Sequence, residues 1–178
     1  YKFFTFMQIH YISENNSILN HFLAQIRDVN IQKDSMRFRK NIERIGEIMA
    51  YELSKTLDYK NIDVQTPLGI KHTTTIAEPV VLCSILRAGL ALHQGFMSFF
   101  DNAENGFVSA YRHHYDNDDK FEILVEYQAA PSFEGKNLIL IDPMLATGQS
   151  LVAVLHKLHL EQKPKEIHLA VVIAAPEG

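Results

Sequence analysis

The sequence predicts an α/β fold with a doubly wound, mostly parallel sheet, flanked by helices and carrying an appended β-hairpin. Two main observations predict this class. Continuous apolar runs recur at residues 80–86, 138–141 and 169–175, and such runs are typical of parallel strands that are covered on both faces. Helical periodicity follows the first two runs, at residues 89–100 and 149–160. The chain is therefore expected to build strand–loop–helix units in series.

Two amphipathic helices are expected before these units. Ser17 can cap the first, whose apolar side chains within residues 18–26 fall on one side. Asp34 or Ser35 can cap the second, and its apolar residues share one arc at helical periodicity: Phe38, Ile42, Ile45, Met49, Leu53 and Leu57. Ahead of both helices, residues 7–12 alternate in polarity and predict an opening strand.

Alternating patterns predict further strands. Residues 62–76 alternate around Pro67-Leu68-Gly69, which indicates the hairpin. Residues 107–111 and 121–127 are two more strand candidates. The polar segment 113–120 lies between them and is expected to form a mobile loop.

Composition bounds the domain count and the partners. The chain has 178 residues, 47% of them hydrophobic and 21% charged, so we expect a single domain over residues 1–178. Residues 1–6 are interpreted as an extension or a cloning remnant ahead of Met7. A net charge of −4 gives no overall attraction to nucleic acid or to an anionic membrane. An anionic ligand must therefore be held by local amide groups and a few cations.

The single cysteine and the short apolar runs indicate the compartment. Cys83 lies inside an apolar run, where a buried core thiol is the expected role, and one cysteine cannot form an internal disulfide. No apolar run approaches the ~20 residues that cross a bilayer. We therefore expect a cytoplasmic protein without membrane contact.

The loop after residues 138–141 carries the first candidate site. An apolar strand there ends in Asp142, and the turn Thr147-Gly148-Gln149-Ser150 opens the next helix. Hydroxyl groups, a permissive glycine and the unpaired amides of a helix start can together bind a phosphate. Asp142 would repel a phosphate but can accept hydrogen bonds from vicinal ribose hydroxyls. The loop therefore predicts a ribose 5-phosphate site, and the alternative is an ordinary helix cap.

A second candidate loop follows residues 80–86. Arg87 offers a planar fork to paired phosphate oxygens, and the small residues Ala88-Gly89 let a ligand approach the backbone. This pattern predicts a diphosphate clamp, and the alternative is a surface arginine beside a helix start. Ligands of parallel sheets collect at the carboxyl ends of the strands, where both loops begin.

Residues 85–90 and 142–150 resemble the uracil phosphoribosyltransferase family, a branch of the type I phosphoribosyltransferases. The matching runs are Ile85-Leu86-Arg87-Ala88-Gly89-Leu90, Asp142-Pro143-Met144-Leu145-Ala146-Thr147-Gly148-Gln149-Ser150, Ala174-Ala175-Pro176-Glu177-Gly178, Arg37-Phe38-Arg39 and Tyr111-Arg112. The similarity extends from about Met7 to the last residue. Type I enzymes usually have two adjacent acids where this chain has Asp142-Pro143, and the family commonly has a second glycine where this chain has Gln149.

The resemblance implies a set of site residues. Asp142, Arg87 and Arg112 would be catalytic, with Arg87 on the diphosphate and Arg112 reaching it from the loop over the site, which would exclude water. Phosphoribosyl diphosphate would be bound by Arg87, Ala88, Gly89, Arg112, Asp142, Pro143, Met144, Leu145, Ala146, Thr147, Gly148, Gln149 and Ser150. Uracil would be recognised by a Gly-rich segment expected beyond Gly178.

The resemblance also implies the reaction and its cofactor. The leading hypothesis is transfer of ribose 5-phosphate to uracil for pyrimidine salvage, by a homodimer or higher homo-oligomer. Magnesium would be bound mainly through the diphosphate donor, without a dedicated set of protein ligands. One alternative is a non-catalytic module that senses phosphoribosyl diphosphate or nucleotide. A third hypothesis, transfer to a purine or orotate, is disfavoured by Pro143 and by the Met144-Leu145-Ala146 run.

Overall fold

The computed structural model describes the backbone of residues 7–114, 121–159 and 162–178, and their side chains except at 111–124, 126 and 159. The helices are α1 (Ile18–Arg27), α2 (Ser35–Ser54), α3 (Leu90–Met97) and α4 (Gln149–His159), with a short 3-10 helix η1 (Ile31–Lys33). The strands are β1 (Tyr59–Thr66), β2 (Gly69–Ile76), β3 (Val80–Leu86), β4 (Glu104–His114), β5 (Phe121–Ala129), β6 (Asn137–Ile141), β7 (Met144–Leu145), β8 (Glu166–Ala170) and β9 (Ile173–Ala174).

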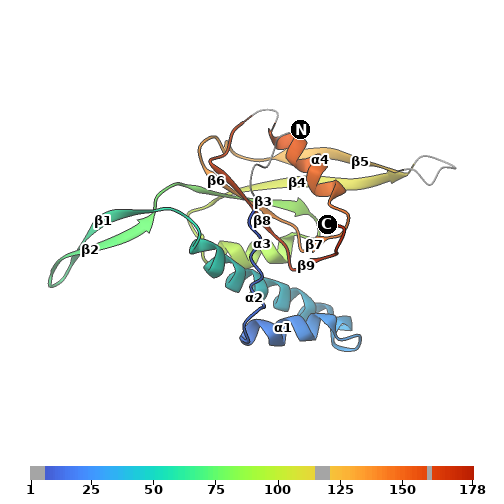
Figure 1. Ribbon diagram of the computed structural model, residues 1–178, viewed down its shortest axis with the longest axis horizontal. Helices are drawn as coiled ribbons and strands as arrows, with labels where there is room; N and C mark the ends of the chain where they lie inside the picture. Colours follow the sequence, from blue (N-terminus) through green and yellow to red (C-terminus); the bar gives the residue numbers. More distant parts are fainter. Residues whose placement is uncertain (1–6, 115–120, 160–161) are drawn as a thin grey trace.

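The central sheet has the predicted, mostly parallel architecture. Within the described residues its strand order is β5-β4-β3-β6-β8. The pairs β3–β4, β3–β6 and β6–β8 are parallel, whereas β5 runs antiparallel to β4 at one edge. Figure 1 shows α4 on one face of this sheet and α1, α2 and α3 on the other. The predicted fold class is therefore confirmed.

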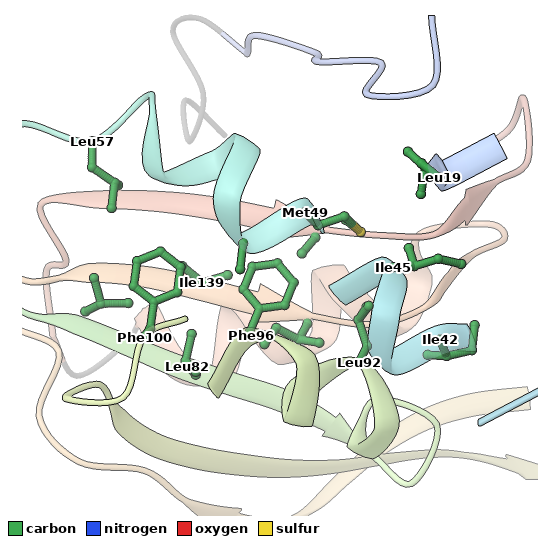
Figure 2. Close-up of a cluster of buried hydrophobic side chains, with 14 of the residues drawn as sticks. Leu19, Ile42, Ile45, Met49, Leu57, Leu82, Leu92, Phe96, Phe100 and Ile139 are labelled. Atoms are coloured by element: carbon green, nitrogen blue, oxygen red, sulfur yellow. The ribbon is translucent and has the colours of Figure 1, made fainter. Parts of the chain in front are cut away.

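The two faces of the sheet are buried in two separate clusters. Leu82 of β3 and Ile139 of β6 face α2 and α3, and Figure 2 shows them beside Phe96 and Phe100. The intervening residues of the same strands pack with α4 in the second cluster: Val81, Cys83, Ile85, Leu138 and Leu140, together with Val154 and Leu158 of α4. Strands covered on both faces must be apolar throughout, which explains the continuous runs in the sequence.

Two glycines bring α2 and α3 into close contact beneath the sheet. A Cβ atom on Gly95 would lie 2.1 Å from the carbonyl oxygen of Glu43, and one on Gly46 would lie 2.6 Å from that of Leu92. Any larger side chain would therefore push the helices apart. Because α3 begins directly after the Arg87 loop, this packing also sets the position of that loop.

The first two helices begin as predicted. The Ser17 side chain accepts a hydrogen bond from Leu19 N at the start of α1, and the Asp34 side chain accepts from Met36 N and Arg37 N at the start of α2. The prediction that the second helical pattern continues to Leu57 was wrong, because α2 ends at Ser54.

Side-chain competition accounts for this end of α2. The hydroxyl groups of Ser54 and Thr56 donate to the carbonyl oxygens of Tyr51 and Leu53, at 2.7 and 2.8 Å. Such bonds compete with helix propagation. Leu57 is nevertheless buried in the core, so its apolar character reflects tertiary packing beyond the helix.

The predicted hairpin is present and projects from the body of the molecule (Figure 1). Strands β1 and β2 pair from Tyr59↔Ile76 to Thr66↔Gly69, so Pro67 and Leu68 form the turn. Lys165 anchors the base of the hairpin, since its Nζ lies 2.7 Å from Asp58 Oδ2 and 2.6 Å from Glu78 Oε1. None of the described helices combines the length and the apolar character that crossing a bilayer requires.

Two strand predictions were wrong. Residues 7–12 form no strand and pair with no edge of the sheet. The alternating apolar side chains of Met7, Ile9 and Tyr11 are exposed, so they gain no burial that would hold the segment against the sheet. Residues 169–175 are divided between β8 and β9. Strand β6, which pairs with β8, ends at the pair Ile141↔Ala170, and the chain then bonds to a different segment. The apolar run alone does not show where the neighbouring strand β6 ends.

Candidate functional site

The two candidate loops lie together at one end of the sheet. Strands β3 and β6 are parallel neighbours with Ser84 opposite Ile141, so the loops beginning at Arg87 and Asp142 leave the sheet on the same side. A Cβ atom on Gly89 would lie 2.9 Å from the carbonyl oxygen of Ile141. The structure thus brings both predicted loops into contact, and only a glycine fits between them.

The Arg87 loop forms the wall of a pocket. This pocket has a volume of about 550 Å³ and is lined by Leu86, Arg87 and Ala88 together with Ser109 and Ala110 of β4. Arg87 and Ala88 are exposed, so the guanidinium group can contact a ligand that enters from solvent.

Ser109 and Ala110 were not among the predicted site residues. They line the pocket because β4 is the parallel neighbour of β3, with Ser109 opposite Leu86, and the register shifts between Ser109 and Ala110. Neither side chain carries a charge that could signal a site. The usable signal was positional, since the carboxyl end of the adjacent strand must flank the Arg87 loop.

Arg112 lies on the same strand, two residues beyond Ala110. Its backbone pairs with Ile123 of β5, so the strand that flanks the pocket also carries Arg112. The side chain of Arg112 and residues 115–120 of the predicted loop lie outside the described part of the chain.

Asp142 occupies the predicted position directly after β6. Its side chain is half-buried, and Oδ1 accepts a hydrogen bond from Met144 N at 3.4 Å. Burial raises the pKa of Asp142 above the ordinary carboxyl value, and the Met144 hydrogen bond acts in the opposite direction. A partly desolvated carboxylate with free acceptor capacity is suited to hydroxyl groups of a ligand.

The backbone of the Asp142 loop is held by the segment that follows β8. The carbonyl oxygen of Pro143 accepts hydrogen bonds from the amides of Val172 and Ile173, each at 3.1 Å, and that of Leu145 accepts from Ala175 at 2.8 Å. These bonds flank the small parallel sheet β7–β9. The loop is therefore fixed to the rest of the protein before α4 begins.

The turn before α4 presents free amide groups. Gly148 adopts φ +74°, a left-handed conformation that favours glycine, and its carbonyl oxygen accepts from Val152 N at 2.9 Å. Within residues 7–114, 121–159 and 162–178, the amides of residues 146–150 donate to no other protein group. Thr147 and Gln149 are exposed and Ser150 is half-buried. Unpaired amides at a helix start favour an anion.

Cys83 belongs to the core and not to the site. It is 1% exposed, on the face of β3 that packs against α4. Burial raises the pKa of its thiol to about 12, so the thiolate required of a nucleophile is disfavoured. The predicted role as a core thiol is confirmed.

Comparison with known sequences decides the family. The sequence model of the uracil phosphoribosyltransferase family matches residues 12–178. The chain belongs to this family. A uracil phosphoribosyltransferase from Porphyromonas gingivalis is 46% identical over 172 residues, covering 97% of this chain and 79% of the relative. One from Thermococcus gammatolerans is 36% identical, covering 94% of this chain and 74% of the relative.

Solved structures share the fold of this chain. A protein from Aquifex aeolicus superposes with a TM-score of 0.80 at 30% identity, covering 92% of this chain and 76% of the other. A hypoxanthine phosphoribosyltransferase from Staphylococcus aureus, at 16% identity and a TM-score of 0.57, covers 92% of this chain and 74% of its own. The latter similarity concerns the fold alone, which is that of type I phosphoribosyltransferases.

Proposed function

We propose that this protein transfers ribose 5-phosphate from phosphoribosyl diphosphate to uracil, giving UMP and diphosphate. The observation that carries the proposal is the arrangement of Asp142 and the free amides of residues 146–150 beside the exposed Arg87. One loop supplies a carboxylate and an anion site a few residues apart, and the adjacent loop supplies a cation. This arrangement suits a ligand with hydroxyl groups between two phosphate groups.

Each part of the donor has a proposed place. The 5-phosphate binds the amides of residues 146–150 with the hydroxyls of Thr147 and Ser150, and the ribose hydroxyls donate to Asp142. The diphosphate lies toward Arg87 and the backbone of Ala88-Gly89, with Arg112 as a second cation from β4. Among the other residues of the 142–150 loop, Gln149 adds its free amide to the phosphate contacts. Pro143, Met144 and Leu145 hold the loop in place, because their backbone groups bond to the segment after β8 and to Asp142.

The chemistry needs positioning more than covalent help. The bond between ribose C1 and the diphosphate oxygen breaks, and diphosphate leaves with the bonding electrons. C1 forms a bond to a ring nitrogen of uracil, and the proton of that nitrogen passes to the departing diphosphate. Arg87 stabilises the leaving charge by fixed electrostatic contact. Because two fixed loops hold the donor in one orientation, the protein mainly lowers the entropic cost of bringing the reacting atoms together.

Magnesium is the proposed cofactor, bound mainly through the donor. Within the described residues, no three His, Cys, Asp or Glu side chains converge as a metal site, whereas magnesium is commonly held by substrate phosphates with one or two carboxylates. Asp142 would be the carboxylate that contacts the ion, and magnesium would neutralise charge on the diphosphate. A homo-oligomer and a cytoplasmic location complete the proposal, supported by family membership and by the single core cysteine.

A direct assay tests this function. The full-length protein is incubated with phosphoribosyl diphosphate, magnesium and radiolabelled uracil, and labelled UMP is the expected product. Parallel reactions with radiolabelled hypoxanthine or radiolabelled orotate in place of uracil should give no labelled nucleotide. Donor binding without turnover of any base would overturn the proposal in favour of a sensor of phosphoribosyl diphosphate.

A further inference from the structure

A buried chain of hydrogen bonds lies directly behind the Arg87 loop. His93 of α3 is 3% exposed, and its Nδ1 lies 2.7 Å from Oγ of the fully buried Ser84 on β3. Its Nε2 lies 2.8 Å from Oδ1 of Asn105 at the start of β4. The three side chains join a helix to two strands. None of them was predicted as a site residue, and none has a part in the proposed donor contacts.

The partners fix the tautomer of the ring. Asn105 Nδ2 donates to the carbonyl oxygen of Ala103 at 3.2 Å, so its Oδ1 is the atom that faces His93 and accepts the proton of Nε2–H. Nδ1 is then an acceptor, and the Ser84 hydroxyl donates to it. Burial lowers the pKa of His93, with the Asn105 hydrogen bond acting in the opposite direction. The ring of Phe107 lies 5.0 Å from the imidazole and further restricts it.

The hydrogen bond between Ser84 and His93 links the two ends of the backbone segment that carries Arg87. Ser84 precedes the segment and His93 follows it, and the amide of His93 donates to the carbonyl oxygen of Gly89 at 2.8 Å. A Cβ atom on Gly89 would lie 3.2 Å from Cβ of Ser84. Ser84 is also opposite Ile141, the residue before Asp142. The contact of His93 with Ser84 therefore lies where the two loops meet.

We propose that His93 is a positioning residue for the phosphoribosyl diphosphate site. By bonding to Ser84, it holds the first turn of α3 against the end of β3 and fixes how far Arg87-Ala88-Gly89 stands from Asp142. The inference rests on the proposed function, since it assigns the donor to these two loops. Displacing a binding group by about 1 Å can reduce the rate by about a hundredfold, so a small shift of α3 is measurable.

Three variants of the full-length protein test the proposal. His93→Leu removes both hydrogen bonds, Ser84→Ala removes one with little change in volume, and His93→Asn retains an acceptor near the position of Nδ1. With magnesium present, His93→Leu is expected to raise KM and Kd for phosphoribosyl diphosphate by about tenfold, which corresponds to about 1.4 kcal/mol. KM for uracil should change by less than about twofold, and His93→Asn should restore most of the donor affinity.

A matched variant separates positioning from general loss of stability. Ile139→Val removes one methylene from the core on the same face of the sheet and should lower Tm while leaving donor KM unchanged. If His93→Leu does not fold, Ser84→Ala and His93→Asn carry the test through the same ratio of the two KM values. Equal changes in the KM of donor and uracil, or loss of Tm alone, would overturn the positioning role.

The outcome also distinguishes this inference from the proposed function. Equilibrium dialysis of phosphoribosyl diphosphate measures donor affinity without any turnover. A wild-type protein that does not bind this donor overturns the proposed function together with the inference. A wild-type protein that binds it, with His93→Leu and Ser84→Ala binding equally well, overturns the inference alone.

Discussion

Gly178 lies so close to Leu145 that a Cβ atom on the glycine would stand 2.6 Å from Leu145 Cγ and 2.7 Å from the carbonyl oxygen of Ala146. The contact joins the segment after β9 to the middle of the 142–150 loop. Real Cβ atoms do not approach other atoms this closely, so a substitution at Gly178 must move the loop. The end of the described chain is thus a structural support for the proposed phosphate site.

Gly178→Ala is therefore expected to raise the donor KM by about tenfold, because overpacking at a close contact displaces its neighbours. Steady-state kinetics with varied phosphoribosyl diphosphate measure the effect. The matched control is Gly69→Ala in the hairpin, where φ is +137° but no atom lies within 4 Å of an added Cβ. It should lower stability through backbone strain without altering donor KM. Equal donor KM values in the wild type, Gly178→Ala and Gly69→Ala would contradict the prediction.

Asp142→Asn tests the ribose contact. The amide keeps the shape of the side chain but loses the charge, so turnover is expected to fall by more than about tenfold, or about 1.4 kcal/mol. Asp101→Asn, at an exposed carboxylate beyond α3, is the control and should retain wild-type turnover. An Asp142→Asn enzyme with normal turnover would remove Asp142 from the site.

The raised pKa of Asp142 predicts a pH effect with a definite sign. The pKa of Asp142 is higher in the folded protein than its ordinary value of 3.8. Such a group contributes most to the free energy of unfolding at pH values below 3.8. This contribution is lost as the pH rises through the pKa of the folded state. Asp142→Asn should therefore not reduce the free energy of unfolding at pH 7. The wild-type profile of kcat/KM should fall on the acidic side with an apparent pKa above 3.8. Urea unfolding and a pH series check the two parts.

Arg87→Lys tests the diphosphate contact. Lysine keeps the positive charge but cannot form the planar, two-pronged contact of a guanidinium group. Losing one hydrogen bond to a charged group costs about 1.5–3 kcal/mol, so kcat/KM for the donor should fall at least about tenfold. The same exchange at Arg27, the exposed last residue of α1, should leave kcat/KM unchanged. If kcat/KM for Arg87→Lys also stayed at the wild-type value, the two-pronged guanidinium contact would not be used.

Lys165→Met tests the anchor of the hairpin. The hydrogen bonds to Asp58 and Glu78 raise the pKa of Lys165, so the ammonium form holds both carboxylates over the whole neutral range. Without it, the amide of Ala77, which donates to the carbonyl oxygen of Asp58 at 2.8 Å, should exchange with deuterium faster. Lys163→Met, at a nearby exposed lysine, should leave that exchange rate unchanged. Equal protection in both variants would rule out the anchor.

The sequence predicted those elements whose cause is local. Ser17 and Asp34 begin helices because their side chains accept bonds from the next turn, and Pro67-Leu68 separates two alternating strands. The paired loops at Arg87 and Asp142 were also predictable, because each follows an apolar run. Parallel strands place their carboxyl ends at one edge, so neighbouring strands were sufficient to bring the loops together.

Features that depend on tertiary partners were not predictable. The division of residues 169–175 depends on where β6 ends, and the pocket wall at Ser109 depends on the register between β3 and β4. His93 has the spacing of an ordinary helical residue, and its partner Asn105 lies on a different strand. No local pattern encodes a contact whose members are brought together only by folding.

The concealed sulfhydryl of Cys83 makes this chain a convenient host for site-specific probes. It is the single cysteine in the sequence and is almost inaccessible, so maleimide dyes should leave the native protein unmodified. A cysteine introduced at Leu68, which is 100% exposed at the hairpin tip, would then react alone. Fluorescence from that position could report movements of the hairpin during turnover without first removing a natural thiol.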